Sequence, residues 1–397
     1  INNAHYNIFI YAIFALAELP VYAVSALVGA GIHEPIWYFC GQLVSAGFFI
    51  ACIPLVARIA GELGFPDTDR HYTALAFALF PPAFFSAMVM GQYDSICLFF
   101  MLLGVLNWLR GRMLPFALWF GVGAACKFFP LLVFIPLLLL KEKRPLHLIK
   151  YGLISLWLVA PTTLLFMGRT GDMNTFNNLM VQRLFAAKLP AAANIPIFPL
   201  LYLLLCFFMW LWRPKEEAIG KAGMWAAMAA LGLLFIFVDW HPQWIILIAP
   251  FLLLTTFAEK RRLPWFWIDI ALCAGFFLWG AVSHAHQLEA NLLDFGLIGI
   301  ITNLHTTSYA YNPILYYLNL LPVITVLPMI LFAGALTAHL VCKAPLGPGT
   351  PANRLTKGND VFAVQNLPRA IWLVFAAGIG VWLVPTLFTW LKCFGFI

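Results

Sequence analysis

Charged residues are scarce in this sequence. Its 397 residues include 23 Lys and Arg against 16 Asp and Glu, so that 10% are charged whereas 63% are hydrophobic. Soluble domains are about a quarter charged, and this composition therefore excludes an ordinary soluble protein. We predict an all-α fold, a polytopic transmembrane helical bundle, built as a single integral membrane domain over 1–397.

Several functional signatures are also missing. The eight cysteines form no CxxC pair and lie mostly within apolar runs, which is typical of small buried residues and not of a disulfide framework. The chain has no GxxxxGKS/T or GxGxxG pattern, so a nucleotide-driven reaction is not expected. We predict no cofactor and no metal. The net charge of +7 comes from cations between apolar runs, and so it indicates membrane topology and not a nucleic-acid partner.

The apolar runs predict the membrane segments. A helix needs about 20 residues to cross the hydrocarbon core, and we expect about 10 to 13 segments, including a short-helix hairpin. Residues 6–30 are interrupted by Glu18 and Pro20, so we assign 1–35 to the remainder of a first outer loop. The longer runs lie near 36–57, 72–90, 95–109, 146–167, 195–212, 222–238, 242–258, 264–283, 313–341 and 369–391.

Two runs, 114–126 and 128–140, are too short to cross the membrane singly. Cations precede the pair at Arg112 and follow it at Lys141, and both groups favour the cytoplasmic side. One continuous span would place them on opposite sides. We therefore predict a hairpin with Lys127 at its outer tip.

The remaining loops follow the same charge rule. Basic residues place 343–368 on the cytoplasmic side, where its Pro- and Gly-rich sequence predicts a mobile loop. Residues 284–312 contain no Lys or Arg and are assigned to the outer face. The outer segment 168–194 breaks the rule with Arg169 and Arg183. Either the bundle tolerates these cations, or they bind an anion such as a lipid phosphate.

Three polar segments fall on the predicted outer face. The first is Gly91-Gln92-Tyr93-Asp94-Ser95, in which Asp94 either caps the following helix or faces a cavity. The second is the consecutive sequence Asp239-Trp240-His241-Pro242-Gln243, in which His241 is either an interfacial histidine or a general base. The third includes His284 and His286, which read either as an ordinary wet loop or as a polar site.

The first segment and the hairpin together resemble a known family. The run from Phe80-Pro81-Pro82 to Gly91-Gln92-Tyr93-Asp94, followed by Gly121 to Pro130 with Lys127, is similar to the GT-C glycosyltransferases. The resemblance is closest to polyprenol-phosphate-mannose-dependent mannosyltransferases and to bacterial relatives of GPI-anchor mannosyltransferases. It covers roughly 70–150 and 239–257; elsewhere only the hydropathy agrees.

The resemblance implies a polyprenyl-phosphate sugar as donor and inversion at the anomeric carbon. It also implies an acidic base in the first outer loop, where this chain has no acid before Glu18. We therefore expect a full-length enzyme to carry one more span and an acid upstream of Ile1. The implied location is the plasma membrane of a bacterium.

We accordingly predict a glycosyltransferase that moves a hexose, mannose in the first instance, onto a lipid or glycan acceptor at the outer face. Alternatives are a lipid-linked-sugar flippase or transporter, and an accessory subunit of a membrane complex. The expected catalytic residues are Asp94 and His241. The expected substrate-binding residues are Gln92, Tyr93, Lys127, Arg169, Arg183, Asp239, Gln243, His284 and His286.

Overall fold

The computed structural model describes residues 7–29, 31, 34–166, 182–190, 194–283, 322–344 and 367–393. Three of the expected site residues, Arg169, His284 and His286, lie outside these ranges. So does most of the predicted cytoplasmic loop 343–368.

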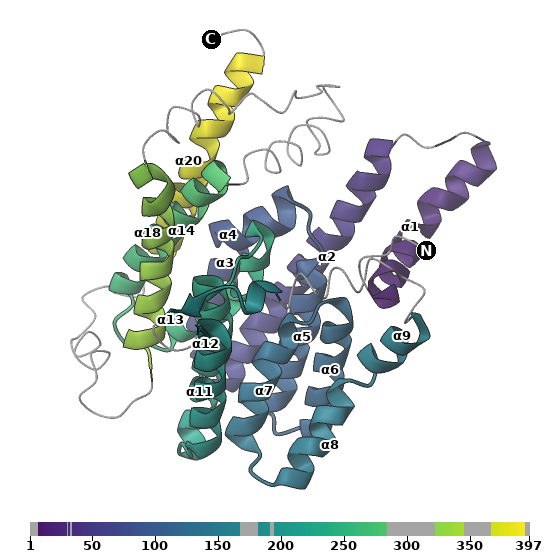
Figure 1. Cartoon of the computed structure of the whole chain (residues 1–397). Helices are drawn as coiled ribbons and strands as arrows, with labels where there is room; N and C mark the ends of the chain where they lie inside the picture. Colours follow the sequence, from purple (N-terminus) through teal and green to yellow (C-terminus); the bar gives the residue numbers. More distant parts are fainter. Residues whose placement is uncertain are drawn as a thin grey trace.

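Helices make up nearly all of the described chain, which confirms the predicted all-α class (Figure 1). Two two-residue strands, β1 (Lys188–Leu189) and β2 (Ile195–Pro196), pair in antiparallel register. The helices of the first half are α1 (Ile8–Val28), α2 (Glu34–Glu62), α3 (Asp67–Ala78), α4 (Pro81–Phe84), the π-helix η1 (Phe85–Val89), α5 (Asp94–Leu109), α6 (Met113–Cys126), α7 (Phe129–Lys141), α8 (Pro145–Ser155) and α9 (Val159–Phe166).

The second half continues the bundle. In Figure 1, α14, α18 and α20 stand side by side, and α5 to α8 form a second group. The helices here are α11 (Ile197–Leu211), α12 (Glu216–Phe237), the 3₁₀-helix η2 (Pro242–Leu247), α13 (Ala249–Phe257), α14 (Leu263–Ser283), α18 (Pro322–Cys342) and α20 (Leu367–Cys393).

The described helices are long and apolar enough for a multi-pass membrane protein. Four of them qualify as spans by length and composition, and up to six spans result if each of two bent pairs is one span. The single-helix candidates are Ile8–Val28, Phe39–Glu62, Glu216–Phe237 and Leu263–Gly280. Seven shorter apolar helices of 10–17 residues complete the described bundle.

The predicted hairpin is present. Helices α6 and α7 meet at Lys127 and Phe128, and their rings Phe116 and Phe134 stack with centroids 4.8 Å apart. At the other end the Lys141 ammonium donates to the Trp108 carbonyl, close to where α6 begins. The two cationic ends of the hairpin therefore lie at the same end of the bundle.

Three sequence-based helix boundaries were wrong. Glu18 and Pro20 do not interrupt α1, which runs through Pro20 as one helix; in apolar surroundings the remaining backbone groups gain most by staying hydrogen-bonded within the helix. The run 72–90 is bent by 52° before Pro81, whose ring disfavours helical geometry at Phe80. The run 146–167 is bent by 50°, which places Pro161 in the first turn of α9, where its missing N–H costs nothing.

Several of the basic loop residues hold helix ends together. Lys143 Nζ donates to the carbonyls of Leu139, Met209 and Trp212, at 2.6, 2.8 and 3.1 Å, and so joins the last turns of α7 and α11. The neighbouring Glu142 accepts from Arg144, which lowers the pKa of its carboxyl to about 2. The loop cations of this end thus neutralise helix C-termini as well as indicating topology.

Candidate functional site

The Gly91-Gln92-Tyr93-Asp94 turn joins two helical segments of different geometry. The π-helix η1 ends at Val89, and α5 begins at Asp94. Between them Gly91 has a φ of 60°, in the left-handed region, and the Gln42 side chain of α2 occupies the space that a Cβ would need. Only glycine fits this position, because both the backbone angle and the packing exclude a side chain.

Gly91→Ala is expected to destabilise the protein more than Gly111→Ala. Gly111 also has a positive φ, 74°, but nothing lies within 4 Å of its hypothetical Cβ, so its variant measures backbone strain alone, about 1–2 kcal/mol. Thermal unfolding in detergent gives the comparison. Adding Gln42→Ala to Gly91→Ala should recover the difference; equal losses for the two glycine variants would contradict this packing.

The turn delivers Asp94 to Lys127 at the tip of the hairpin. Lys127 Nζ donates to Asp94 Oδ1 at 2.6 Å; the Asp94 side chain is 0% exposed and the Lys127 side chain 9% exposed. Asp94 Oδ2 has no hydrogen-bond partner among the described residues. The Asp94 carboxylate is therefore the counter-ion of a buried ammonium. Its negative charge also interacts favourably with the helix dipole at the first turn of α5.

Aromatic rings surround the Lys127 ammonium. Its Nζ lies 4.5 Å from the centroid of Tyr93, 5.8 Å from that of Trp244 and 6.0 Å from that of Phe129. Ring faces attract cations electrostatically. They hold the ammonium at the edge of the bundle, where it can also meet a ligand.

A second polar group also contacts Trp244. The His241 ring contacts Trp244 with centroids 5.4 Å apart, and Arg183 Nη1 donates to His241 Nε2 at 3.1 Å. Arg183 Nε also lies 3.8 Å from Asp239 Oδ2. Because arginine can only donate, His241 Nε2 is the acceptor in this hydrogen bond.

The two groups form one site. Ser86 Oγ of η1 donates to the Gln243 carbonyl of η2 at 2.6 Å, which ties the first polar segment to the second. Gln243 Oε1, like Asp94 Oδ2, is buried without a hydrogen-bond partner among the described residues. The expected residues brought together are Gln92, Tyr93, Asp94, Lys127, Arg183, Asp239, Gln243 and His241.

Sequence reasoning missed the residues that connect these groups. Trp244 and Phe129 were two of many aromatic residues in apolar runs, and Ser86 lay within one such run. Trp244 directly follows Gln243, and this position next to the polar segment was the one sequence feature that could have indicated its place in the site. Within the described ranges, no group of three or more His, Cys, Asp or Glu side chains is placed to hold a metal ion.

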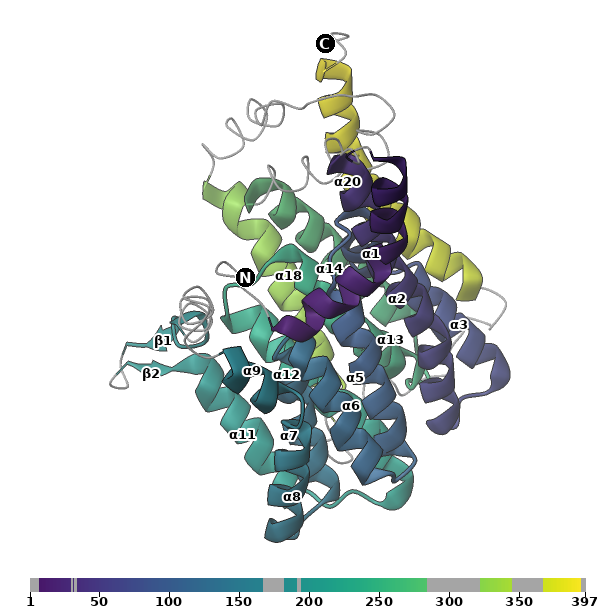
Figure 2. The same cartoon turned by 90° about the vertical axis from the view of Figure 1, so that its right-hand side faces the viewer.

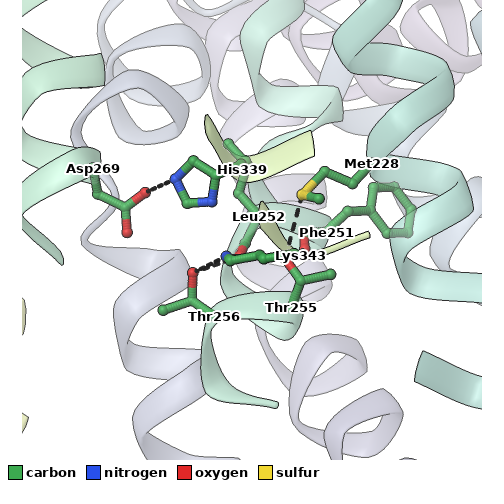
Figure 3. Close-up of polar contacts among 8 residues, drawn as sticks. All are labelled: Met228, Phe251, Leu252, Thr255, Thr256, Asp269, His339 and Lys343. Carbon is green, nitrogen blue, oxygen red and sulfur yellow. Dashed lines mark hydrogen bonds and ion pairs between the residues drawn. The ribbon is translucent and has the colours of Figure 1, made fainter. Parts of the chain in front are cut away.

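A separate polar cluster lies at the basic end of the bundle (Figure 3). Lys343 Nζ donates to Thr256 Oγ1 at 2.7 Å, and Nε2 of the fully buried His339 lies 3.1 Å from Asp269 Oδ1. The ammonium also lies 4.4 Å from the centroid of Trp265. This ammonium binds the last turns of α13 much as Lys143 binds α7 and α11, so we assign the cluster to packing.

Comparison with models of protein families gives a match to part of the chain. A model of glycosyltransferase family 87 matches residues 9–186, which include the Asp94–Lys127 pair and end before His241. No curated protein matches the chain. Over this range the chain is similar to that family, and the match supports a membrane glycosyltransferase.

Proposed function

We propose that the protein is a GT-C-like glycosyltransferase that moves a hexose, most simply mannose, from a polyprenyl-phosphate donor to a lipid or glycan acceptor. The observation that carries the proposal is that Trp244 lies near both Lys127 and His241, and that Arg183 is hydrogen-bonded to His241, which brings two cations to one site. The proposed transfer takes place at the outer face of the membrane, on the side opposite the Lys- and Arg-rich loops, and the proposed location is a bacterial plasma membrane. The activated donor supplies the driving force, so no cofactor is required.

The cations form the subsite for the donor phosphate. When the sugar leaves, negative charge grows on the phosphate oxygens, and pre-positioned cations stabilise that charge most. Lys127 is held by its 2.6 Å ion pair with Asp94, so it does not have to reorganise during the reaction, whereas Arg183 shifts its hydrogen bond from His241 to the phosphate. If Arg169 joins them, it does so from the same predicted outer segment as Arg183.

The other polar residues of the site bind the sugar and the acceptor substrate. Asp94 Oδ2 and Gln243 Oε1 are buried acceptors that lack a donor among the described residues, and hydroxyl groups supply such donors. Gln92 and Tyr93 lie in the same turn as Asp94 and extend the polar surface. His241, neutral at Nε2, accepts a proton from the attacking hydroxyl once Arg183 moves its hydrogen bond to the phosphate. The role of His284 and His286 in substrate binding stays a prediction, because both residues lie outside the described ranges.

Transfer from labelled polyprenyl-phosphate mannose tests the function, and Arg183→Ala tests the phosphate subsite. Loss of a charge-assisted hydrogen bond should raise the KM for the donor roughly ten- to hundredfold, with a much smaller change for the acceptor. Arg144→Ala is the matched control, because Arg144 is 70% exposed in the loop at the opposite end of the bundle. Equal loss for both substrates would remove Arg183 from this role. Absence of transfer by the wild-type protein would favour a flippase or an accessory subunit.

A further inference from the structure

Helix α1 carries one carboxylate and no Asp, Lys, Arg or His, and that carboxylate lies at the middle of the helix. Glu18 is the eleventh of the 21 residues of α1, in a segment otherwise apolar enough to cross a membrane. A carboxylate at such a position is costly and ordinarily faces protein or water. No described residue donates a hydrogen bond or contributes an ion pair to it.

The side chain of Glu18 faces α2. Its Oε1 lies 3.9 Å from the position that a Cβ on Gly41 would take, and Phe14 Cε1 lies 3.8 Å from the same point. Phe14 and Glu18 are four residues apart and therefore share this face of α1. Figure 2, in which α1 crosses α2, shows the pairing of the two helices.

This face of α1 borders the Gly91 turn. The Phe14 ring contacts Tyr93 edge-on, with centroids 6.3 Å apart. Gln42, the neighbour of Gly41, is the residue that packs against Gly91. Glu18 thus stands one helical turn along α1 from a direct contact with the site.

The charge of Glu18 decides what it can bind. Asp94 is neutralised by Lys127, and Asp239 lies against Arg183, so each already has a cationic partner. Glu18 has none among the described residues and can only accept hydrogen bonds when ionised. A carboxylate repels a phosphate but is a strong acceptor for hydroxyl groups.

We infer that Glu18, with Gln42 and the Gly91 turn, forms a subsite for a polyhydroxylated acceptor, entered between α1 and α2. The inference rests on the proposed function, because it assigns the acceptor to the α1 side of the Gly91 turn. Phe14 supplies an apolar surface beside the carboxylate, as sugar rings require on their C–H faces.

The test uses the full chain in detergent, labelled polyprenyl-phosphate mannose as donor and octyl mannoside as acceptor. Glu18→Leu should raise the KM for octyl mannoside roughly ten- to hundredfold, as expected for loss of a hydrogen bond to a charged group, and leave the KM for the donor within about twofold. Glu18→Gln keeps one acceptor oxygen and should give an intermediate value. Glu62→Gln, in the exposed pair with Arg110 at the far end of α2, is the matched control and should behave as wild type.

Folding is checked by thermal unfolding, where leucine in an apolar helix should be neutral or stabilising. An unchanged KM for octyl mannoside in Glu18→Leu, or equal changes for both substrates, overturns the inference. If the wild-type protein transfers no sugar, the proposed function fails first. Equilibrium binding of labelled octyl mannoside then still decides: retained wild-type binding that weakens in Glu18→Leu supports the subsite, and binding that is absent or unchanged overturns it.

Discussion

The single variants Asp94→Asn and Lys127→Met are each expected to abolish sugar transfer. Each is also expected to destabilise the helical bundle. Each change leaves one charge of a pair whose side chains are 0% and 9% exposed. An uncompensated buried charge costs about 3–5 kcal/mol, which is far above the loss expected from a missing helix cap. The near-identical shape of asparagine does not protect the fold here, because the stranded Lys127 ammonium carries the penalty.

The double variant Asp94→Asn with Lys127→Met separates stability from activity. With both charges removed, thermal unfolding should return most of the way to wild type, because replacement of a buried pair by neutral groups is often neutral or stabilising. Transfer should stay abolished, because the cation for the donor phosphate is gone. Asp67→Asn provides the control: it breaks an ion pair whose carboxylate is 83% exposed, worth at most about 1 kcal/mol.

Recovery of transfer in the double variant would show that the pair is only structural. Wild-type stability in both single variants would show that the pair is solvated in the membrane protein, contrary to its burial. The two readouts therefore test separate statements about the same two residues.

Charge and hydropathy predicted much of this arrangement from the sequence. Arg112 and Lys141 required the hairpin, and its tip at Lys127 then fell on the same side as Asp94. The bends before Pro81 and Val159 escaped prediction because hydropathy averages over a bent segment as easily as over a straight one.

The contacts within the site could not be predicted in the same way. Topology places Asp94 and Lys127 at one face, but a 2.6 Å ion pair between residues 33 apart depends on how α5, α6 and α7 pack. Trp244 gains its place between Lys127 and His241 only because η2 packs against η1. The position of Glu18 on the face of α1 that contacts α2 could not be predicted either, because the sequence favoured an interruption of the helix at Glu18 and Pro20.

The packing of α14 against α18 gives the other large expected effect. A Cβ on Gly275 would lie 2.6 Å from the Phe332 nitrogen and 2.7 Å from the Pro328 carbonyl oxygen, both backbone atoms of α18. Backbone cannot rotate aside as a side chain can, so Gly275→Ala must push the two helices apart. Overpacking of this kind costs about 1–3 kcal/mol, and small residues at such contacts are what allow membrane helices to approach closely.

The displacement should reach the candidate site. Phe332 contacts Trp240 with ring centroids 5.2 Å apart, and Trp240 precedes His241. Gly275→Ala should therefore lower both the unfolding temperature and the rate of transfer, although Gly275 touches neither substrate subsite.

Gly334→Ala on α18 is the matched control, because nothing lies within 4 Å of its hypothetical Cβ. Replacement of a helical glycine by alanine there should be neutral or stabilising by up to about 1 kcal/mol. If Gly275→Ala matched Gly334→Ala in both measurements, the close approach of α14 to α18 would be refuted, and with it the route by which this packing positions His241.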